Sequence, residues 1–191
     1  MSLWSDRFCV RDSLCRVGYQ HVVNLSFQTR CLVTNGSILI MFAGSSSVQQ
    51  AAALPFRKSD SGYELLFVST KRRGRWVFPK GWPKKGEALC DAAAREALEE
   101  AGVNGRVASQ SLGSYRYKKS MSQGYDVPCE VFVFPYRVDS EEITWREDGP
   151  RARRWCPLSD APGLCDEPGL SHLLETLDPT SNAIFASLVT C

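Results

Sequence analysis

Three glutamates that share one face of an expected helix are the residues of this chain best suited to chemistry. The segment Leu89–Ala101 has the pattern of an amphipathic helix, and Gly102 follows it as a C-terminal cap. Because a helix turns by about 100° per residue, Glu100 lies about 40° to one side of Glu96 and Glu99 about 60° to the other. Like charges on one face repel, and a cation would remove that repulsion. Hard oxygen ligands of this kind favour Mg²⁺, with Mn²⁺ as a substitute.

Residues next to these glutamates extend the constellation. Arg95 precedes Glu99 by one helical turn and can hold it by a charge-assisted hydrogen bond. Gly81 ends a basic loop, where its backbone carbonyl could face the metal. The ordinary alternative is a solvated helix face made of good helix formers. We favour a metal site because many spaced positions, with glycines at both ends, fit together.

The stretch from residue 81 to 103 resembles the Nudix box, G-x5-E-x7-R-E-U-x-E-E-x-G-U, at every fixed position. The matching residues are Gly81, Glu87, Arg95, Glu96, Glu99, Glu100 and Gly102, with Ala97 and Val103 at the apolar positions. The resemblance implies an α/β/α sandwich with a mixed sheet and Mg²⁺-dependent hydrolysis of a phosphoanhydride bond. It also implies metal binding by Glu96, Glu99, Glu100 and the carbonyl of Gly81.

A bound metal would neutralise the phosphates and lower the pKa of a water molecule, and a carboxylate would take the proton of that water. We expect Glu99 or Glu100 to act as this base, with Glu130 as the second choice. The resemblance gives Glu87 a supporting role. The expected catalytic residues are Glu87, Arg95, Glu99 and Glu100.

The resemblance extends beyond the box, from Gln49 to Leu177. Segments 50–57, 74–86, 113–118, 128–135 and 153–161 are similar to short bacterial Nudix hydrolases, which are related to diphosphoinositol polyphosphate phosphohydrolases. This similarity implies a dinucleoside polyphosphate or a diphosphoinositol polyphosphate as substrate. Gly81-Trp82 stands where animal inositol-pyrophosphate enzymes favour a glycine run, which argues against specificity for inositol. ADP-ribose or nucleoside triphosphate pyrophosphohydrolase activity is the alternative. A non-catalytic module that binds a ligand or RNA is less favoured, because all box glutamates are kept.

Basic side chains around the box suit an anionic polyphosphate substrate. Lys80 and Lys84 lie in the loop that enters the helix, and Arg116 and Lys118 alternate along one strand, so that both can point to one face. We expect these four residues to bind substrate, with ordinary surface solvation as the alternative. The net charge of +2 gives no reason to expect a nucleic-acid partner.

Strands and helices must position these residues. We expect strands at 51–56, 63–70, 76–79, 107–117, 127–138 and 153–157, and helices at 89–101 and 170–177. This mixture predicts an α/β layered fold. Residues 48–180 are the expected Nudix domain and 181–191 a C-terminal tail. Residues 1–47 form an N-terminal extension that is either disordered or not native to the mature protein, although Asn35-Gly36 favours a hairpin between 31–34 and 37–42.

Cysteine usage and hydropathy give further expectations. The eight cysteines contain no CxxC pair, which favours free thiols in a reducing compartment over a zinc site. No run of apolar residues approaches the ~18 that a membrane span needs. We therefore expect a cytoplasmic protein without a membrane partner, and the sequence leaves its oligomeric state open.

Overall fold

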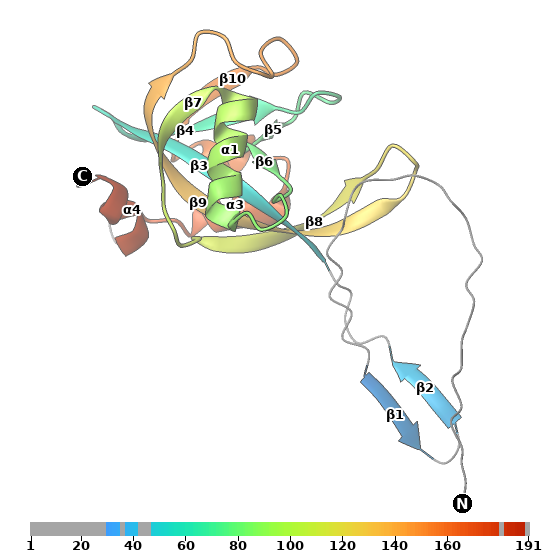
Figure 1. Ribbon diagram of the computed structural model, residues 1–191. Coiled ribbons are helices and arrows are strands. Elements are labelled where there is room, and N and C mark those ends of the chain that lie inside the picture. The colour runs from blue at the N-terminus through green and yellow to red at the C-terminus, as the bar shows by residue number, and fades with distance from the viewer. Residues whose placement is uncertain (1–29, 35–36, 42–46, 180–181, 190–191) are drawn as a thin grey trace, which may run out of the picture.

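The computed structural model describes residues 30–34, 37–41, 47–179 and 182–189 of the 191-residue chain. A mixed, eight-stranded sheet forms its centre (Figure 1). The strands are β3 (Val48–Ser59), β4 (Gly62–Ser69), β5 (Trp76–Val77), β6 (Lys80–Gly81), β7 (Val103–Val107), β8 (Gly113–Ser120), β9 (Asp126–Glu141) and β10 (Arg153–Pro157). Their order is β10-β4-β3-β9-β7, with β5 paired to β4, β6 to β3 and β8 to β9.

The centre of the sheet is the parallel pair β3–β9, whereas the other pairs are antiparallel. Seven consecutive residues of β3, from Gln50 to Phe56, are buried. A strand covered on both faces reads as a continuous apolar run rather than an alternation, and Ala51–Phe56 has that pattern. The sequence therefore reveals the middle of β3, although not its full length.

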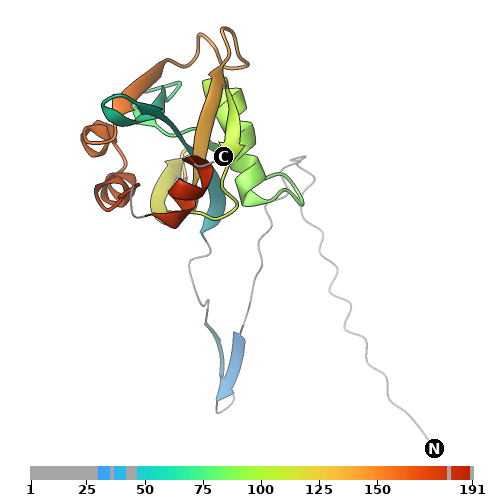
Figure 2. The same cartoon turned by 90° about the vertical axis from the view of Figure 1, so that its left-hand side faces the viewer.

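Helices cover both faces of the sheet (Figure 2). They are α1 (Leu89–Ala101), α2 (Ala161–Leu164), α3 (Pro168–Glu175) and α4 (Ala183–Val189). Small residues of α1, among them Ala93 and Ala97, pack on one face against Ala51 and Leu66. Residues of α3 and α4 join the core cluster of the other face. The predicted α/β/α sandwich with a mixed sheet is confirmed.

The C-terminal end of α1 is fixed by two close contacts. Gly102 adopts a left-handed conformation with φ 59°, and its N–H bonds to the carbonyls of Ala97 and Leu98. A Cβ at position 102 would lie 2.7 Å from Cβ of Trp145. Glycine is thus required here both by the backbone and by the neighbouring ring, and this end of the helix carries Glu99 and Glu100.

The observed elements differ from the expected ones at several boundaries. The predicted strand at 107–117 is divided, since β7 ends at Val107 and β8 begins at Gly113. The segment 181–191, which was expected to be a tail, contains α4, whose Phe185 is fully buried with its ring centroid 4.0 Å from that of Phe56. A short turn motif does not show where the preceding strand ends and the next one begins. A single buried aromatic residue gives no periodic pattern from which α4 could be predicted.

The expected N-terminal hairpin is present as a separate two-stranded sheet. β1 (Arg30–Thr34) pairs antiparallel with β2 (Ser37–Met41). Residues 35 and 36, where the turn was predicted, lie outside the described residues, as do 1–29 and 42–46. The division at residue 47 therefore stays a prediction. None of the helices in the described residues is long and apolar enough to span a membrane.

Candidate active site

Helix α1 carries two buried carboxylates that point toward β6. Glu96 and Glu100 are 9% and 7% exposed, although both are charged side chains. A Cβ on Gly81 would lie 2.0 Å from Oε1 of Glu96, so this carboxylate occupies the space above the glycine. Oε2 of Glu100 accepts a hydrogen bond of 3.1 Å from the backbone N–H of Lys80. The one-turn spacing of the two glutamates thus places both beside the same short strand.

Arg95 joins the loop that precedes α1 to the helix. Its Nε and Nη2 donate to the two oxygens of Glu87 at 2.9 and 3.0 Å, and Nη2 also donates to the carbonyl of Trp82 at 3.0 Å. Nη1 donates to Glu96 at 2.6 Å, whereas Glu99 lies 3.8 Å away. Arg95 therefore holds Glu87 and Glu96 more closely than Glu99, the partner predicted from helical spacing. The hydrogen bond from Arg95 is the main reason that the pKa of Glu87 lies below its ordinary value.

The loop at 142–152, between β9 and β10, brings further charges to the glutamates. Nη1 of Arg146 lies 2.7 Å from Oε2 of Glu99. Arg151 forms an ion pair with Glu100, and its Nε donates to Glu147 at 2.5 Å. This loop was not recognised in the sequence, because it has no motif and no periodic pattern. The opposite charges of Glu147 and Arg151 were the only feature of the sequence that could have indicated this loop, and such pairs are common on protein surfaces.

Glu147 is a further carboxylate close to α1. Nζ of Lys71 donates to it at 2.8 Å. Burial raises its pKa, but the hydrogen bonds from Lys71 and Arg151 outweigh burial and hold the pKa below the ordinary value. The charge of Glu147 acts on both Glu96 and Glu100. Glu147 is therefore an ionised carboxylate at the edge of the candidate site.

The same loop caps the end of α1. Nε1 of Trp145 donates to the carbonyl of Glu100 at 3.1 Å, and Nη1 of Arg153 donates to that of Ala101 at 3.1 Å. The guanidinium of Arg153 lies 4.0 Å from the centroid of the Trp145 ring. Free carbonyls at a helix end need such donors. These contacts fix the position of Glu100 from the C-terminal side.

Burial changes the acidity of the two inner glutamates. It raises the pKa of Glu96 above its ordinary value, although Arg95 opposes the change. It raises the pKa of Glu100 to about 7, with Arg151 as the main opposing charge. A second positive charge placed beside these carboxylates would favour their ionised forms.

The donor set fits a divalent cation of the Mg²⁺ type. Glu96, Glu99 and Glu100 offer hard oxygens, and the bare Cα of Gly81 leaves a space that a side chain would fill. As they stand in the described residues, no three Asp, Glu, His or Cys side chains are gathered closely enough to hold a metal ion. Each of the three glutamates is instead paired with an arginine. The residues that would hold the cation are Glu96, Glu99, Glu100 and the carbonyl of Gly81.

The four basic residues predicted to bind substrate have different environments. Nζ of Lys80 forms an ion pair of 3.1 Å with Glu167, and the two side chains are only 10% and 9% exposed. The ammonium of Lys80 is thus held inside the domain by Glu167, and its predicted role in substrate binding stays a prediction. Lys84, Arg116 and Lys118 are exposed. In the described part of the chain, no hydrogen bond or ion pair connects these three residues to Glu96, Glu99 or Glu100, so their role stays a prediction.

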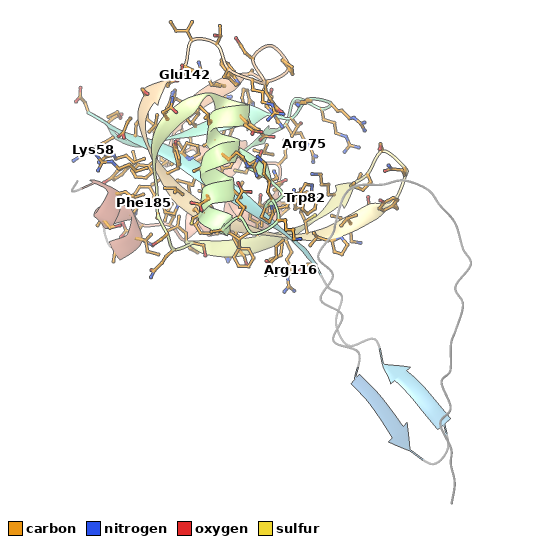
Figure 3. All side chains as sticks on the ribbon, viewed as in Figure 1. Lys58, Arg75, Trp82, Arg116, Glu142 and Phe185 are labelled. Atoms are coloured by element: carbon orange, nitrogen blue, oxygen red, sulfur yellow. The ribbon has the colours of Figure 1, made fainter. Side chains whose placement is uncertain are left out.

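Glu130, the second candidate for the base, lies on β9 opposite Arg116. Its carboxylate accepts a hydrogen bond of 3.1 Å from Ser114, and Arg116 lies 3.7 Å away with 77% of its side chain exposed (Figure 3). Within residues 47–179, no hydrogen bond or ion pair connects Glu130 to the glutamates of α1. Glu147 therefore interacts electrostatically with the candidate site more strongly than Glu130 does.

The four cysteines that the structure describes form no ion pair or hydrogen bond with Glu96, Glu99 or Glu100. Cys90, Cys129, Cys156 and Cys165 are free thiols, as predicted for the positions that the structure describes. Burial raises the pKa of Cys165 to about 12, so its thiol stays protonated.

Known proteins resemble this chain over the region that carries the site. The model of the NUDIX domain matches residues 48–177. Nudix hydrolase 16, mitochondrial, of Arabidopsis thaliana is 33% identical over 137 residues, which are 65% of this chain and 76% of that protein. Diphosphoinositol polyphosphate phosphohydrolase 3-alpha of Mus musculus is 31% identical over 133 residues, which are 68% of this chain and 77% of that protein.

The fold is also that of solved structures. The C. elegans Ap4A hydrolase superposes with a TM-score of 0.51 at 20% identity, over 75% of this chain and 99% of that one. These relatives bear out the similarity to diphosphoinositol polyphosphate phosphohydrolases, but they do not support a particular likeness to short bacterial enzymes. Because the domain model spans more than half of the chain and the relatives are hydrolases, this chain belongs to the Nudix family of hydrolases that act on pyrophosphate bonds.

Proposed function

We propose that this protein hydrolyses a phosphoanhydride bond in a polyphosphorylated small molecule, with Mg²⁺ as its cofactor. The observation that carries the proposal is the pair of buried carboxylates, Glu96 and Glu100, beside the uncovered Cα of Gly81. Burying two acids without a ligand is costly, and their raised pKa values express that cost. A site that binds a cation and a phosphate chain explains why Glu96 and Glu100 are buried beside Gly81.

The cation supplies charge neutralisation of the phosphates and a water of lowered pKa when it is bound. The chain supplies its ligands and keeps them in place. Glu96 is held by Arg95, which is itself fixed by both oxygens of Glu87. Glu87 therefore acts as a positioning residue.

Proton transfer from the attacking water needs a carboxylate that is ionised near neutral pH. The candidates for this base include Glu99, which is half-buried, and Glu100. Glu147 joins them as a candidate, because hydrogen bonds from Lys71 and Arg151 keep it ionised close to the site. We place Glu99 and Glu147 ahead of Glu100, because the ion pair with Arg151 and the hydrogen bond from the backbone N–H of Lys80 hold the Glu100 carboxylate in the place of a metal ligand.

Among substrates, we propose a dinucleoside polyphosphate or a diphosphoinositol polyphosphate. The likeness to the mouse diphosphoinositol polyphosphate phosphohydrolase supports this class, because it covers 68% of this chain. The exposed cations Lys84, Arg116 and Lys118 are consistent with a strongly anionic ligand.

The test is a hydrolysis panel with Mg²⁺. It compares dinucleoside polyphosphates, a diphosphoinositol polyphosphate, ADP-ribose and nucleoside triphosphates, with product phosphates separated by chromatography. We expect the highest kcat/KM on the longer phosphate chains and a loss of at least about 1,000-fold in Glu96→Gln. The control is Lys58→Met, which changes an exposed residue near the C-terminal end of β3 and should keep wild-type activity. No turnover of any member of the panel would overturn the proposed function, and a preference for ADP-ribose would overturn the substrate class.

A further inference from the structure

Two pairs of side chains lie on β3, β8 and the loop after β6, and their members on β8, Tyr117 and Lys119, share one face of that strand. We call Gln50, Trp82, Tyr117 and Lys119 the Lys119 cluster. The Tyr117 hydroxyl donates to Oε1 of Gln50 at 2.6 Å. Nζ of Lys119 lies 4.7 Å from the centroid of the Trp82 ring. Tyr117 and Lys119 alternate with Arg116 and Lys118 along β8 and therefore point to the opposite face of that strand.

Lys119 has a positive charge that no acid neutralises directly. Among the described residues, none of the ion pairs includes Lys119, whereas Lys80 is paired with Glu167 and Lys71 with Glu147. Its ammonium is half-buried, and this burial lowers its pKa. The contact with Trp82 offsets only part of the cost of burying a charge, because such contacts contribute about 0.5–2 kcal/mol. An ammonium in this state favours an anion.

The cluster lies close to the candidate catalytic residues. The carboxylates of Glu100 and Glu96 act electrostatically on Lys119 and partly offset the fall in its pKa. Trp82 directly follows Gly81, and its carbonyl accepts from Arg95. Figure 3 shows Trp82 in the loop between β6 and α1. A molecule that reaches the glutamates of α1 can therefore also reach Lys119.

Gln50 provides an independent sign of a ligand. It is fully buried, and Tyr117 occupies its carbonyl oxygen. Its Nε2 has no hydrogen-bond partner and is the only buried side-chain nitrogen or oxygen of the described residues in that state. Native structures leave few such donors unpaired, because each one costs stability. An oxygen atom of a bound molecule, received beside Tyr117, would remove this cost.

We propose that the Lys119 cluster is a subsite for a phosphate group of the substrate that is not attacked. The cluster combines a cation, an unpaired amide donor and two aromatic rings, which suits a phosphate attached to a larger organic moiety. This inference rests on the proposed function, since the glutamates of α1 hold the pyrophosphate that is cut. It also assigns the main phosphate contact on β8 to Lys119 rather than to Arg116 or Lys118, which face the other way.

The experiment separates binding at the cluster from catalysis. The probe is inorganic tripolyphosphate, titrated calorimetrically into the full chain in EDTA, so that no metal takes part. Lys119→Met and Gln50→Leu are compared with wild type and with Lys58→Met, an exposed control. We expect Lys119→Met to weaken binding by about 10-fold or more, Gln50→Leu by less, and Lys58→Met to leave it unchanged. Thermal unfolding of each variant shows whether the cluster is intact.

The second readout is kcat/KM with Mg²⁺ on a long dinucleoside polyphosphate and on ADP-ribose. Lys119→Met should lose more on the longer substrate, and Lys119→Arg should recover most of that loss. Absence of tripolyphosphate binding by wild type, or equal affinity of Lys119→Met and Lys58→Met, would overturn the subsite. If no substrate of the panel is hydrolysed although Lys119→Met weakens tripolyphosphate binding, then the proposed function fails while the subsite stands.

Discussion

Gly81 and Glu96 are so close that a methyl group on the glycine would occupy the place of the carboxylate. The Cβ of an alanine at position 81 would lie 2.0 Å from Oε1 of Glu96 and 2.8 Å from its Oε2. We therefore expect Gly81→Ala to displace the Glu96 carboxylate, weaken Mn²⁺ binding by about 10-fold or more and lower kcat by a similar factor. Electron paramagnetic resonance of free Mn²⁺ measures the binding.

The matched control for this substitution is Gly86→Ala. Gly86 lies in the same loop and has no atom within 4 Å of its would-be Cβ, although its φ of 79° makes alanine strained. A loss of stability without a loss of metal affinity is expected there. Unchanged Mn²⁺ affinity in Gly81→Ala would contradict the place given to Glu96 in the metal site.

Glu100 should make the stability of the metal-free protein depend on pH. Its pKa is about 7 in the folded state and 4.5 without the fold, so the folded state keeps the proton longer as pH rises. The free energy of unfolding that this group contributes is present below pH 4.5 and is lost as pH rises to about 7. Relative to wild type, Glu100→Gln should gain about 2–4 kcal/mol between pH 4.5 and pH 8. Urea unfolding in EDTA measures the difference.

Added Mg²⁺ gives the complementary observation at Glu100. Saturating metal should stabilise wild type at pH 8 and stabilise Glu100→Gln much less, because the variant lacks a charged ligand. Parallel stability curves for the two proteins across this pH range, with equal responses to Mg²⁺, would refute the prediction.

The ion pair of Lys80 and Glu167 should be a structural element of the domain. Glu167 also accepts a hydrogen bond of 2.6 Å from Tyr115, so its loss removes both the acidic partner of the Lys80 ammonium and the acceptor of the Tyr115 hydroxyl. Glu167→Ala is expected to lower the free energy of unfolding by about 3–5 kcal/mol. The double variant Lys80→Met with Glu167→Leu should regain most of this loss, since apolar replacements leave no buried charge. If the double variant were as unstable as the sum of the two single changes, then the pair would not act as a unit.

Arg146 should compete with the cation for Glu99. Its guanidinium lies 2.7 Å from Glu99, but 69% of the arginine side chain is exposed. An exposed pair contributes about 0.2–1 kcal/mol, so Arg146→Gln should tighten Mn²⁺ binding by no more than about 5-fold. Arg106→Gln, at an exposed arginine that pairs with Asp139 at 3.8 Å, should leave the affinity unchanged. Weaker binding in Arg146→Gln would show that the arginine supports the metal site instead.

Local patterns account for the parts of the protein that were predicted correctly. The limits of α1 follow from spacing within a few turns and from the glycine at position 102, whose conformation ends a helix. The face shared by Glu96 and Glu100 follows from the same helical spacing, and both are buried together beside β6. These features need no knowledge of residues that are distant in the sequence.

Distant contacts account for the parts that were missed. Arg151 meets Glu100 across 51 residues, and Lys80 meets Glu167 across 87. Nothing near Lys80 distinguishes a buried lysine from a solvated one, because its acidic partner becomes a neighbour only when α3 packs on the sheet. The face of β8 on which Lys119 lies follows from strand alternation, but only once the limits of β8 are known.

The position of β9 has a consequence for the synthesis of the chain. This strand pairs with β3, β7 and β8, and its parallel register with β3 runs from Val48 opposite Cys129 to Phe56 opposite Arg137. A growing chain on the ribosome therefore makes β3 and β4 long before their central partner exists, and folding must wait for it. Translation products that stop before Cys129 leave the apolar edge of β3 open, and such open edges lead to aggregation.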